Sequence, residues 1–151
     1  MKRALVWMRR DLRLADNPAL RAALDRELHP VPVYIHDSGL PTEGAAGHWW
    51  LHHSLLALQQ ELRRLGSDLL IIAGDSRTQL QAVAHACNAS HVFWNRQYDP
   101  AGVALETGVM TDLADAGLSA ESFPGNLLRE PETLAKRDGT PYRVFTPFYR
   151  E

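Results

Sequence analysis

Short apolar runs alternate with longer amphipathic stretches along most of the chain. Continuous apolar runs, typical of strands buried on both faces, occupy residues 4–8, 31–36, 68–73 and 91–95, with a weaker fifth at 118–123. Apolar residues recur at helical spacing in residues 18–28, 48–65 and 100–116 and in a stretch that follows Ser76. The pattern therefore predicts strands separated by helices.

Local signals mark several helix ends. Asn17, followed by Pro18, predicts the N-cap of the first helix. Gly66 follows the leucine-rich helix at 48–65 as a natural terminator. The run Ser76-Arg77-Thr78-Gln79 has the form of a capping box, which predicts Ser76 as the N-cap of the third helix.

Strands that alternate with helices through short links predict an α/β fold with a doubly wound, five-stranded parallel sheet and helices on both faces. Two strand orders suit this Rossmann-like arrangement, 3-2-1-4-5 and 2-1-3-4-5, and the first is favoured. Ligands of such sheets bind beyond the carboxyl ends of the strands, where the strand order reverses. In the favoured order that point lies between the first and fourth strands.

The alternation stops after Pro124. The remaining residues are polar, rich in turn formers and end in aromatics, and they predict neither helix nor strand. We expect residues 1–124 to form the α/β domain and residues 125–151 to begin a linker toward a further domain.

Composition narrows the cellular setting. The 151 residues are 45% hydrophobic and 23% charged, with a net charge of −2, so nothing global indicates a polyanionic partner. The one cysteine, Cys87, cannot form a disulfide within the chain and has the spacing of a core residue. Because no apolar run approaches the length of a membrane span, we expect a cytoplasmic protein without membrane contact.

Charged and polar side chains gather at the two strand ends that the favoured order brings together. Arg10 follows the first strand, and Gln97 and Asp99 follow the fourth, so these three are candidates to hold an anionic or polar aromatic ligand. The same strand ends and that of the second strand add further candidate cofactor-binding residues, His36, Asp37, Asn95 and Tyr98.

A structural interpretation competes with the ligand site. Arg9, Asp11, Arg13 and Asp16 could pair with one another and hold the loop against the first helix. Arg10 has no partner in that scheme and stays available to a ligand.

Several kinds of chemistry lack their sequence signals. The first strand is not followed by G-x-G-x-x-G, and neither a P-loop nor a serine elbow G-x-S-x-G is present. His48 and His52 stand at i and i+4 on a predicted helix, but without the glutamate of H-E-x-x-H. We therefore expect neither a metal site nor a catalytic acid or base in this chain.

Three segments resemble the photolyase and cryptochrome family. VWMRRDLRLADNPAL at 6–20 is similar to the opening of that family, HVFWNRQYDP at 91–100 to its fourth strand, and YRVFTPFYR at 142–150 to its exit from the N-terminal domain. The resemblance spans the chain. It implies the N-terminal antenna domain of a flavoprotein whose helical C-terminal domain holds FAD and binds damaged DNA.

The resemblance also implies an activity for the full-length protein. A photolyase is a carbon–carbon lyase that uses light and reduced FAD to split cyclobutane pyrimidine dimers, after flipping the dimer out of the duplex. We expect a monomer when full-length. Two alternatives stay open: a cryptochrome-like blue-light sensor without repair, and a stand-alone nucleotide-binding module.

The family's second chromophore varies, and the sequence favours one kind. Arg10 and Asp99 match the pattern of deazaflavin-binding relatives, whereas Gln97 stands where an acid would be expected. Folate-binding relatives have an Asn-Glu pair where this chain has Ala101 and Gly102. An 8-hydroxy-5-deazaflavin-like antenna is thus favoured over a folate, and an empty crevice is the alternative.

Overall fold

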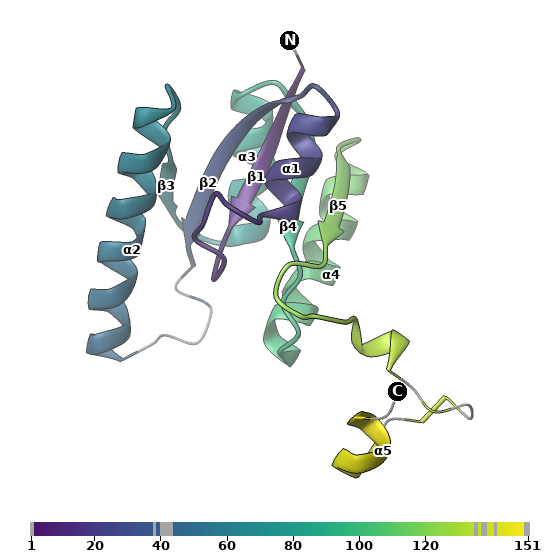
Figure 1. Ribbon diagram of the computed structural model, residues 1–151. Helices are drawn as coiled ribbons and strands as arrows, with labels where there is room; N and C mark the ends of the chain where they lie inside the picture. Colours follow the sequence, from purple (N-terminus) through teal and green to yellow (C-terminus); the bar gives the residue numbers. More distant parts are fainter. Residues whose placement is uncertain are drawn as a thin grey trace.

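The computed structural model describes residues 2–37, 39, 44–134, 136, 139–140 and 142–149. Its centre is a parallel sheet in the order β3-β2-β1-β4-β5 (Figure 1). The strands are β1 (Arg3–Met8), β2 (His29–His36), β3 (Leu70–Ala73), β4 (Ala89–Asn95) and β5 (Ser119–Phe123). Both the predicted fold class and the favoured strand order are confirmed.

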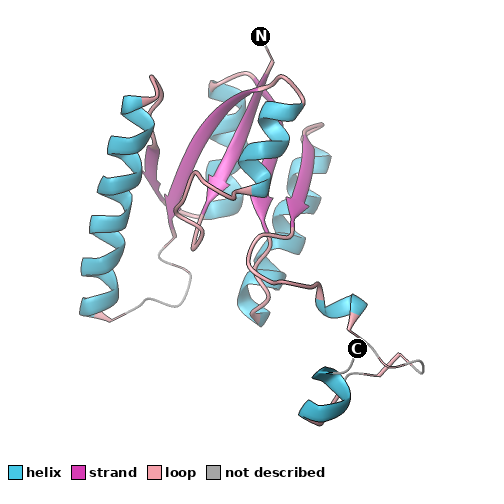
Figure 2. Ribbon diagram, viewed as in Figure 1, coloured by secondary structure: helices cyan, strands magenta, loops and turns pink. Residues whose placement is uncertain are grey.

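Helices cover both faces of the sheet (Figure 2). They are α1 (Pro18–Asp25), α2 (Ala45–Arg64), α3 (Ser76–Ala86) and α4 (Pro100–Asp115). One core lies between the sheet and α1 with α2, and the other between the sheet and α3 with α4. The sequence of the central strand β1 is continuously apolar because both of its faces are buried. Val6 faces the first core, and Leu5 and Trp7 face the second.

Strand β2 begins two residues earlier than predicted and includes both Pro30 and Pro32. These prolines pair with β1, whereas β3 pairs only with residues Val33 to His36. The prolines thus lie in the part of β2 that has β1 as its neighbour and no strand on the other side. On that unpaired side, the missing N–H of a proline costs no hydrogen bond between strands.

The N-cap prediction for the first helix is confirmed, because the Asn17 side chain accepts a hydrogen bond from the backbone N–H of Leu20. The prediction for the third helix is wrong by one residue. Asp75 is the N-cap, and its carboxylate accepts from the backbone N–H of Thr78. Ser76 is the first helical residue, and its backbone N–H donates to the carboxylate of Asp37 at 2.8 Å.

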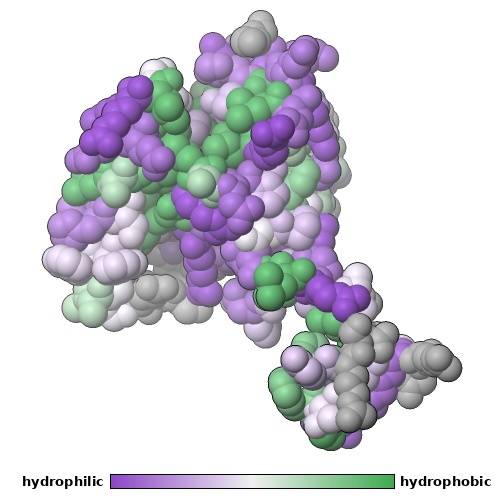
Figure 3. Space-filling view, in the orientation of Figure 1, coloured by the Kyte–Doolittle hydropathy of each residue, from purple (hydrophilic) through white to green (hydrophobic). Residues whose placement is uncertain are grey.

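The segment after β5 contradicts the expectation of neither helix nor strand. It forms a 3₁₀ helix, η1 (Pro131–Thr133), and a short α5 (Phe145–Tyr149), which lies away from the sheet (Figure 1). Ring contacts between Phe145 and Tyr149 and between Tyr142 and Phe148 accompany α5. Apolar side chains recur on the surface of this segment (Figure 3).

Across the described residues, no helix has the combination of length and apolar character that a bilayer crossing requires.

Candidate functional site

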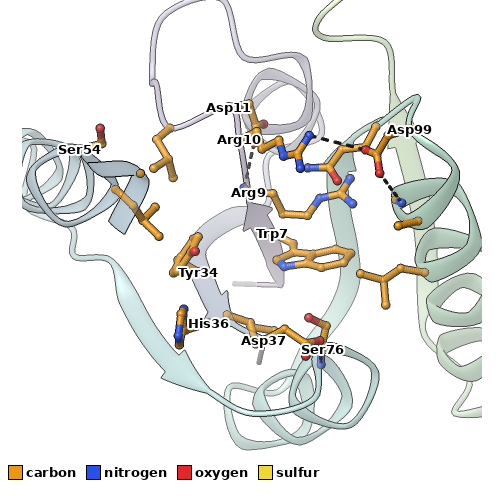
Figure 4. A pocket seen from close by; sticks show the side chains of 18 of the residues that line it. Trp7, Arg9, Arg10, Asp11, Tyr34, His36, Asp37, Ser54, Ser76 and Asp99 are labelled. Atoms are coloured by element: carbon orange, nitrogen blue, oxygen red, sulfur yellow. Dashed lines mark hydrogen bonds and ion pairs between the residues drawn. The ribbon is translucent and has the colours of Figure 1, made fainter. Parts of the chain in front are cut away.

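A crevice of about 560 Å³ opens at the carboxyl ends of the strands, beside the segments that follow β1, β2 and β4 (Figure 4). The loop after β1, the end of β2, the first half of α2 and the start of α4 line it. Five of the seven predicted cofactor-binding residues are among the lining: Arg10, His36, Asp37, Gln97 and Asp99. The predicted place of a ligand site and the observed cavity therefore coincide.

An ion pair joins two of these residues at the rim. Arg10 Nη1 lies 3.7 Å from Asp99 Oδ2, and the two side chains are 64% and 38% exposed. Asp99 is also the N-cap of α4, with Oδ1 accepting from the backbone N–H of Gly102 at 3.0 Å. That hydrogen bond, followed by the charge of Arg10, holds the pKa of Asp99 below its usual value. Asp99 is thus fixed, whereas its ion pair with Arg10 is loose.

The neighbouring arginine is bound quite differently. Arg9 Nη2 lies 2.6 Å from Glu106 Oε1, with side chains 8% and 13% exposed, and donates to the backbone carbonyl of Asn95 at 2.6 Å. The guanidinium lies over the indole of Trp7, 4.3 Å from the ring centroid. Burial lowers the pKa of Arg9, although Glu106 and nearby carboxylates act to raise it. This charge belongs to the interior of the domain.

Asn95 lies behind the crevice instead of in its lining. Its side-chain nitrogen donates to Asp11 at 2.6 Å and to Asn17 at 2.9 Å, and its oxygen accepts from the backbone N–H of Ala19 at 3.0 Å. The side chain is therefore the link between β4, the loop after β1 and the start of α1.

Tyr98 also lies outside the lining. Its hydroxyl donates to Glu130, which in turn pairs with Arg96 at 2.8 Å. The Tyr98 hydrogen bond and then the Arg96 contacts place the pKa of Glu130 below its ordinary value. Tyr98 thus helps to attach the segment after β5 to the end of β4.

The competing structural interpretation is right in part: Asp11 bonds to Arg9 and Arg13 to Asp16, but through backbone groups and not as ion pairs. Arg9 pairs with Glu106, while Asp11 accepts from the backbone N–H of Arg9 at 2.9 Å. Arg13 donates to the backbone carbonyls of Asp16 and Gly125, at 3.1 and 2.6 Å. Hydrogen bonds to the backbone, more than ion pairs within the loop, hold this segment in place.

The end of β2 and the start of α3 close the far side of the crevice. Burial acts to raise the pKa of Asp37, but hydrogen bonds from Ser76 and the backbone N–H of Gly39 outweigh it, and the pKa lies below the usual value. His36 and His48 face each other with ring centroids 6.5 Å apart. Within the described part of the chain, no three side chains of histidine, cysteine or carboxylate type cluster as metal ligands would.

Sequence reasoning missed two groups of lining residues. The apolar pattern marks Trp7 only as part of a buried strand, yet its indole, 1% exposed, lies beneath the crevice and is among the lining residues (Figure 4). His48, Trp50, Leu51 and Ser54 of α2 line the opposite wall. The cluster of imidazole and indole groups at the start of α2 is the one sequence feature that could have indicated this wall. The sequence does not show that α2 approaches the strand ends, because that depends on the tertiary fold.

Gly102 shows why small residues follow Asp99. A Cβ atom at this position would lie 2.8 Å from Gln97 Cβ and 2.9 Å from Asp99 Oδ2. Both of these side chains line the crevice, and a side chain at position 102 would have to displace them.

Comparison with known proteins agrees with this architecture. A family model described as DNA photolyase matches residues 4–151. The deoxyribodipyrimidine photo-lyase of Agrobacterium fabrum is 44% identical over 146 residues, which are 97% of this chain and 30% of that protein. Cryptochrome-2 of Arabidopsis thaliana is 35% identical over 154 residues, covering 99% of this chain and 25% of the relative.

A solved structure gives the same result. The crystal structure of a bacterial class III photolyase from Agrobacterium tumefaciens matches with a TM-score of 0.92 and 44% identity, over 99% of this chain and 31% of that one. The chain thus spans less than a third of the length of each of these three relatives. Because the family model matches nearly every residue, the chain belongs to the DNA photolyase family.

Proposed function

We propose that this chain is the chromophore-holding N-terminal domain of a deoxyribodipyrimidine photolyase, which repairs cyclobutane pyrimidine dimers in DNA with light. The observation that carries the proposal is the 44% identity to a photolyase across 97% of the chain. The division into residues 1–124 and a linker from 125 belongs to the proposal, as do a full-length monomer in the cytoplasm and a helical domain that holds FAD and binds damaged DNA.

The crevice fits a light-harvesting chromophore in its shape and donor groups. Trp50, which is 69% exposed, offers a flat aromatic surface, and Arg10 is an exposed cation whose ion pair with Asp99 is loose. A planar heteroaromatic molecule with an anionic or carbonyl-bearing edge suits such a site. When bound, the chromophore would supply light absorption and pass its energy on through space, so the residues of this chain need only bind and orient it.

An 8-hydroxy-5-deazaflavin is the favoured chromophore, on two grounds. Arg10 and Asp99 stand together at the rim, as the resemblance to deazaflavin-binding relatives implies. A glutamate at position 102, as in folate-binding relatives, would need Gln97 and Asp99 to move, because even a Cβ there approaches both within 2.9 Å.

Light-dependent repair by the full-length protein that contains this chain is the test. Dimer-containing DNA should be repaired in light and not in darkness, and the pigments extracted from the protein should be FAD and the crevice chromophore. Arg10→Gln should remove the chromophore's band from the action spectrum while light absorbed by FAD still drives repair. Repair that is equal in light and darkness would contradict the photolyase assignment.

A cryptochrome-like light sensor is the second candidate, because Cryptochrome-2 of Arabidopsis thaliana is 35% identical over 99% of the chain. It predicts a flavin-containing protein that leaves dimers intact under light. The same assay therefore separates the two candidates.

A further inference from the structure

The first half of α2 carries a large aromatic side chain that the core of the domain does not use. The buried residues of α2 all lie in its second half, at Leu55, Leu58 and Leu62. Toward its start the helix continues past the carboxyl ends of the strands (Figure 1). Trp50 lies in this first half and is 69% exposed. Packing against the sheet therefore does not account for a tryptophan at this position.

One face of the same helical segment borders the crevice. The residues of α2 that line the crevice are Gly47, His48, Trp50, Leu51 and Ser54. Positions 47, 50, 51 and 54 have the i, i+3, i+4 and i+7 spacing of a single helix face. The Ser54 hydroxyl donates to the backbone carbonyl of Trp50 at 2.9 Å, so it is already bonded. The indole of Trp50 thus adds an accessible aromatic surface to this wall of the crevice.

The neighbouring tryptophan is placed differently. Trp49 is 62% exposed, close to the value for Trp50, but it is not among the lining residues. The Trp49 ring contacts the ring of His53, with centroids 4.2 Å apart. Among the described residues, the Trp50 ring has no aromatic contact of this kind. The two indoles are similarly exposed, and what distinguishes Trp50 is its position beside a cavity.

We propose that Trp50 is a binding residue on which the planar ring of the chromophore stacks. This inference rests on the proposed function of the crevice as an antenna site. Aromatic rings attract one another in offset-stacked or edge-to-face arrangements, and covering an indole also removes a large apolar area from water. Stacking depends little on which donors and acceptors a ligand carries at its edge, because every planar heteroaromatic ring has a π face. Trp50 therefore supplies affinity, and the polar groups of the rim select among chromophores.

Titration of the full-length, FAD-containing protein, freed of its antenna, tests the proposal. The probes are 8-hydroxy-5-deazariboflavin and 5,10-methenyltetrahydrofolate, whose planar rings differ at their edges. Trp50→Leu should weaken the binding of both probes about tenfold and leave the ratio of the two affinities unchanged. Trp50→Phe keeps a ring that can stack and should lose no more than about threefold.

Trp49→Leu is the matched control. It removes a similarly exposed indole from the next position of the same helix, outside the crevice lining. Both affinities should stay within about twofold of the wild-type values. Trp49→Leu and Trp50→Leu thus differ only in whether the lost indole borders the crevice.

A spectroscopic measurement separates stacking from a merely structural role. The electronic transitions of two stacked π systems couple, so a probe stacked on the indole should absorb less strongly in its long-wavelength band than the free probe. Trp50→Leu saturated with the probe should lose most of this decrease, whereas Trp49→Leu should keep it.

Unchanged affinities in Trp50→Leu would overturn the inference, and so would an equal loss in Trp49→Leu or a loss confined to one probe. A lower FAD content or thermal stability of Trp50→Leu with both affinities intact would overturn it too, and would show that another part of the full-length protein covers the indole. If the wild type binds only one probe, the contrast between the two leucine variants for that probe decides. Failure of the wild type to bind either probe would instead overturn the antenna function on which the inference rests.

Discussion

Arg9 and Arg10 are neighbours in the sequence, and each faces a carboxylate of the fourth β–α unit, yet they differ in almost every physical respect. Arg9 is buried 2.6 Å from Glu106, whereas Arg10 is mostly exposed and 3.7 Å from Asp99. An exposed pair at that distance contributes little to stability. A buried pair is costly to break, because removal of one partner leaves a charge without compensation.

The difference separates the floor of the crevice from its rim. The floor is made of Trp7 and Arg9, and Glu106 and the Asn95 carbonyl behind it hold Arg9 in the domain core. At the rim, Asp99 is held as the N-cap of α4, and the exposed side chain of Arg10 can move without disturbing that core. A site of this kind combines a rigid surface for recognition with a cation that is available to the ligand.

The largest expected effect is a loss of stability when the hydrogen bonds behind the crevice are removed. Asn95→Ala removes the bonds to Asp11, Asn17 and the Ala19 backbone, and should lower the free energy of unfolding of the chain by about 4 kcal/mol. Urea unfolding measures it. Asn126→Ala is the control, because among the described residues Asn126 makes one exposed side-chain bond, of 3.4 Å, and its loss should change stability by less than about 0.5 kcal/mol. Equal effects of the two would refute the central role of Asn95.

The two ion pairs can be compared directly. Glu106→Gln leaves the buried Arg9 without a charged partner and should destabilise the chain by about 3 kcal/mol. Asp99→Asn keeps the capping oxygen of α4 and removes only the exposed pair, and should cost less than about 1 kcal/mol. The same urea experiment checks both, and a cost for Asp99→Asn as large as for Glu106→Gln would contradict the distinction between floor and rim.

Two glycines of α4 sharpen the description of the rim. Alanine is favoured over glycine in a helix by about 1 kcal/mol. Gly108→Ala should realise part of that gain, because its Cβ would meet the far end of the Arg77 side chain, which can shift at the expense of its exposed ion pair with Asp112. Gly102→Ala should not, since its Cβ would meet Gln97 Cβ at 2.8 Å. Thermal unfolding of the two variants measures the contrast, and an equal gain in both would show that the rim has room for a side chain at position 102.

The smallest effect concerns the titration of Asp99. Its pKa is lowered in the folded chain, so its contribution to stability is present above the pKa of an unfolded aspartate and disappears as the pH falls through the lower, folded value. Arg10→Gln should raise the pKa of Asp99 only slightly, because the hydrogen bond from Gly102 is the larger cause. Carboxyl NMR titration checks this, and a full return to the ordinary aspartate value would make Arg10 the dominant cause.

Local and periodic features of the chain were enough to predict the fold. Continuous apolar strands, amphipathic helices and short links led to the five-stranded sheet, the order β3-β2-β1-β4-β5 and the place of the crevice. These features act over a few residues or through rules of strand connection, so they can be read without coordinates. Charged residues at the ends of β1 and β4 likewise pointed to Arg10 and Asp99 as neighbours.

Only the tertiary structure decided which polar residue does what. Asn95, Gln97 and Tyr98 all stand at the end of β4 in the sequence. Gln97 lines the crevice, but Asn95 points toward α1 and Tyr98 bonds to Glu130, 32 residues away. Glu106 meets Arg9 across 97 residues, and no periodicity marks that pairing. The physical reason is that burial and hydrogen-bond partners depend on the packing of whole elements. Arg9 and Arg10 have identical side chains one residue apart, yet Arg9 is a buried structural cation and Arg10 an exposed one at the crevice.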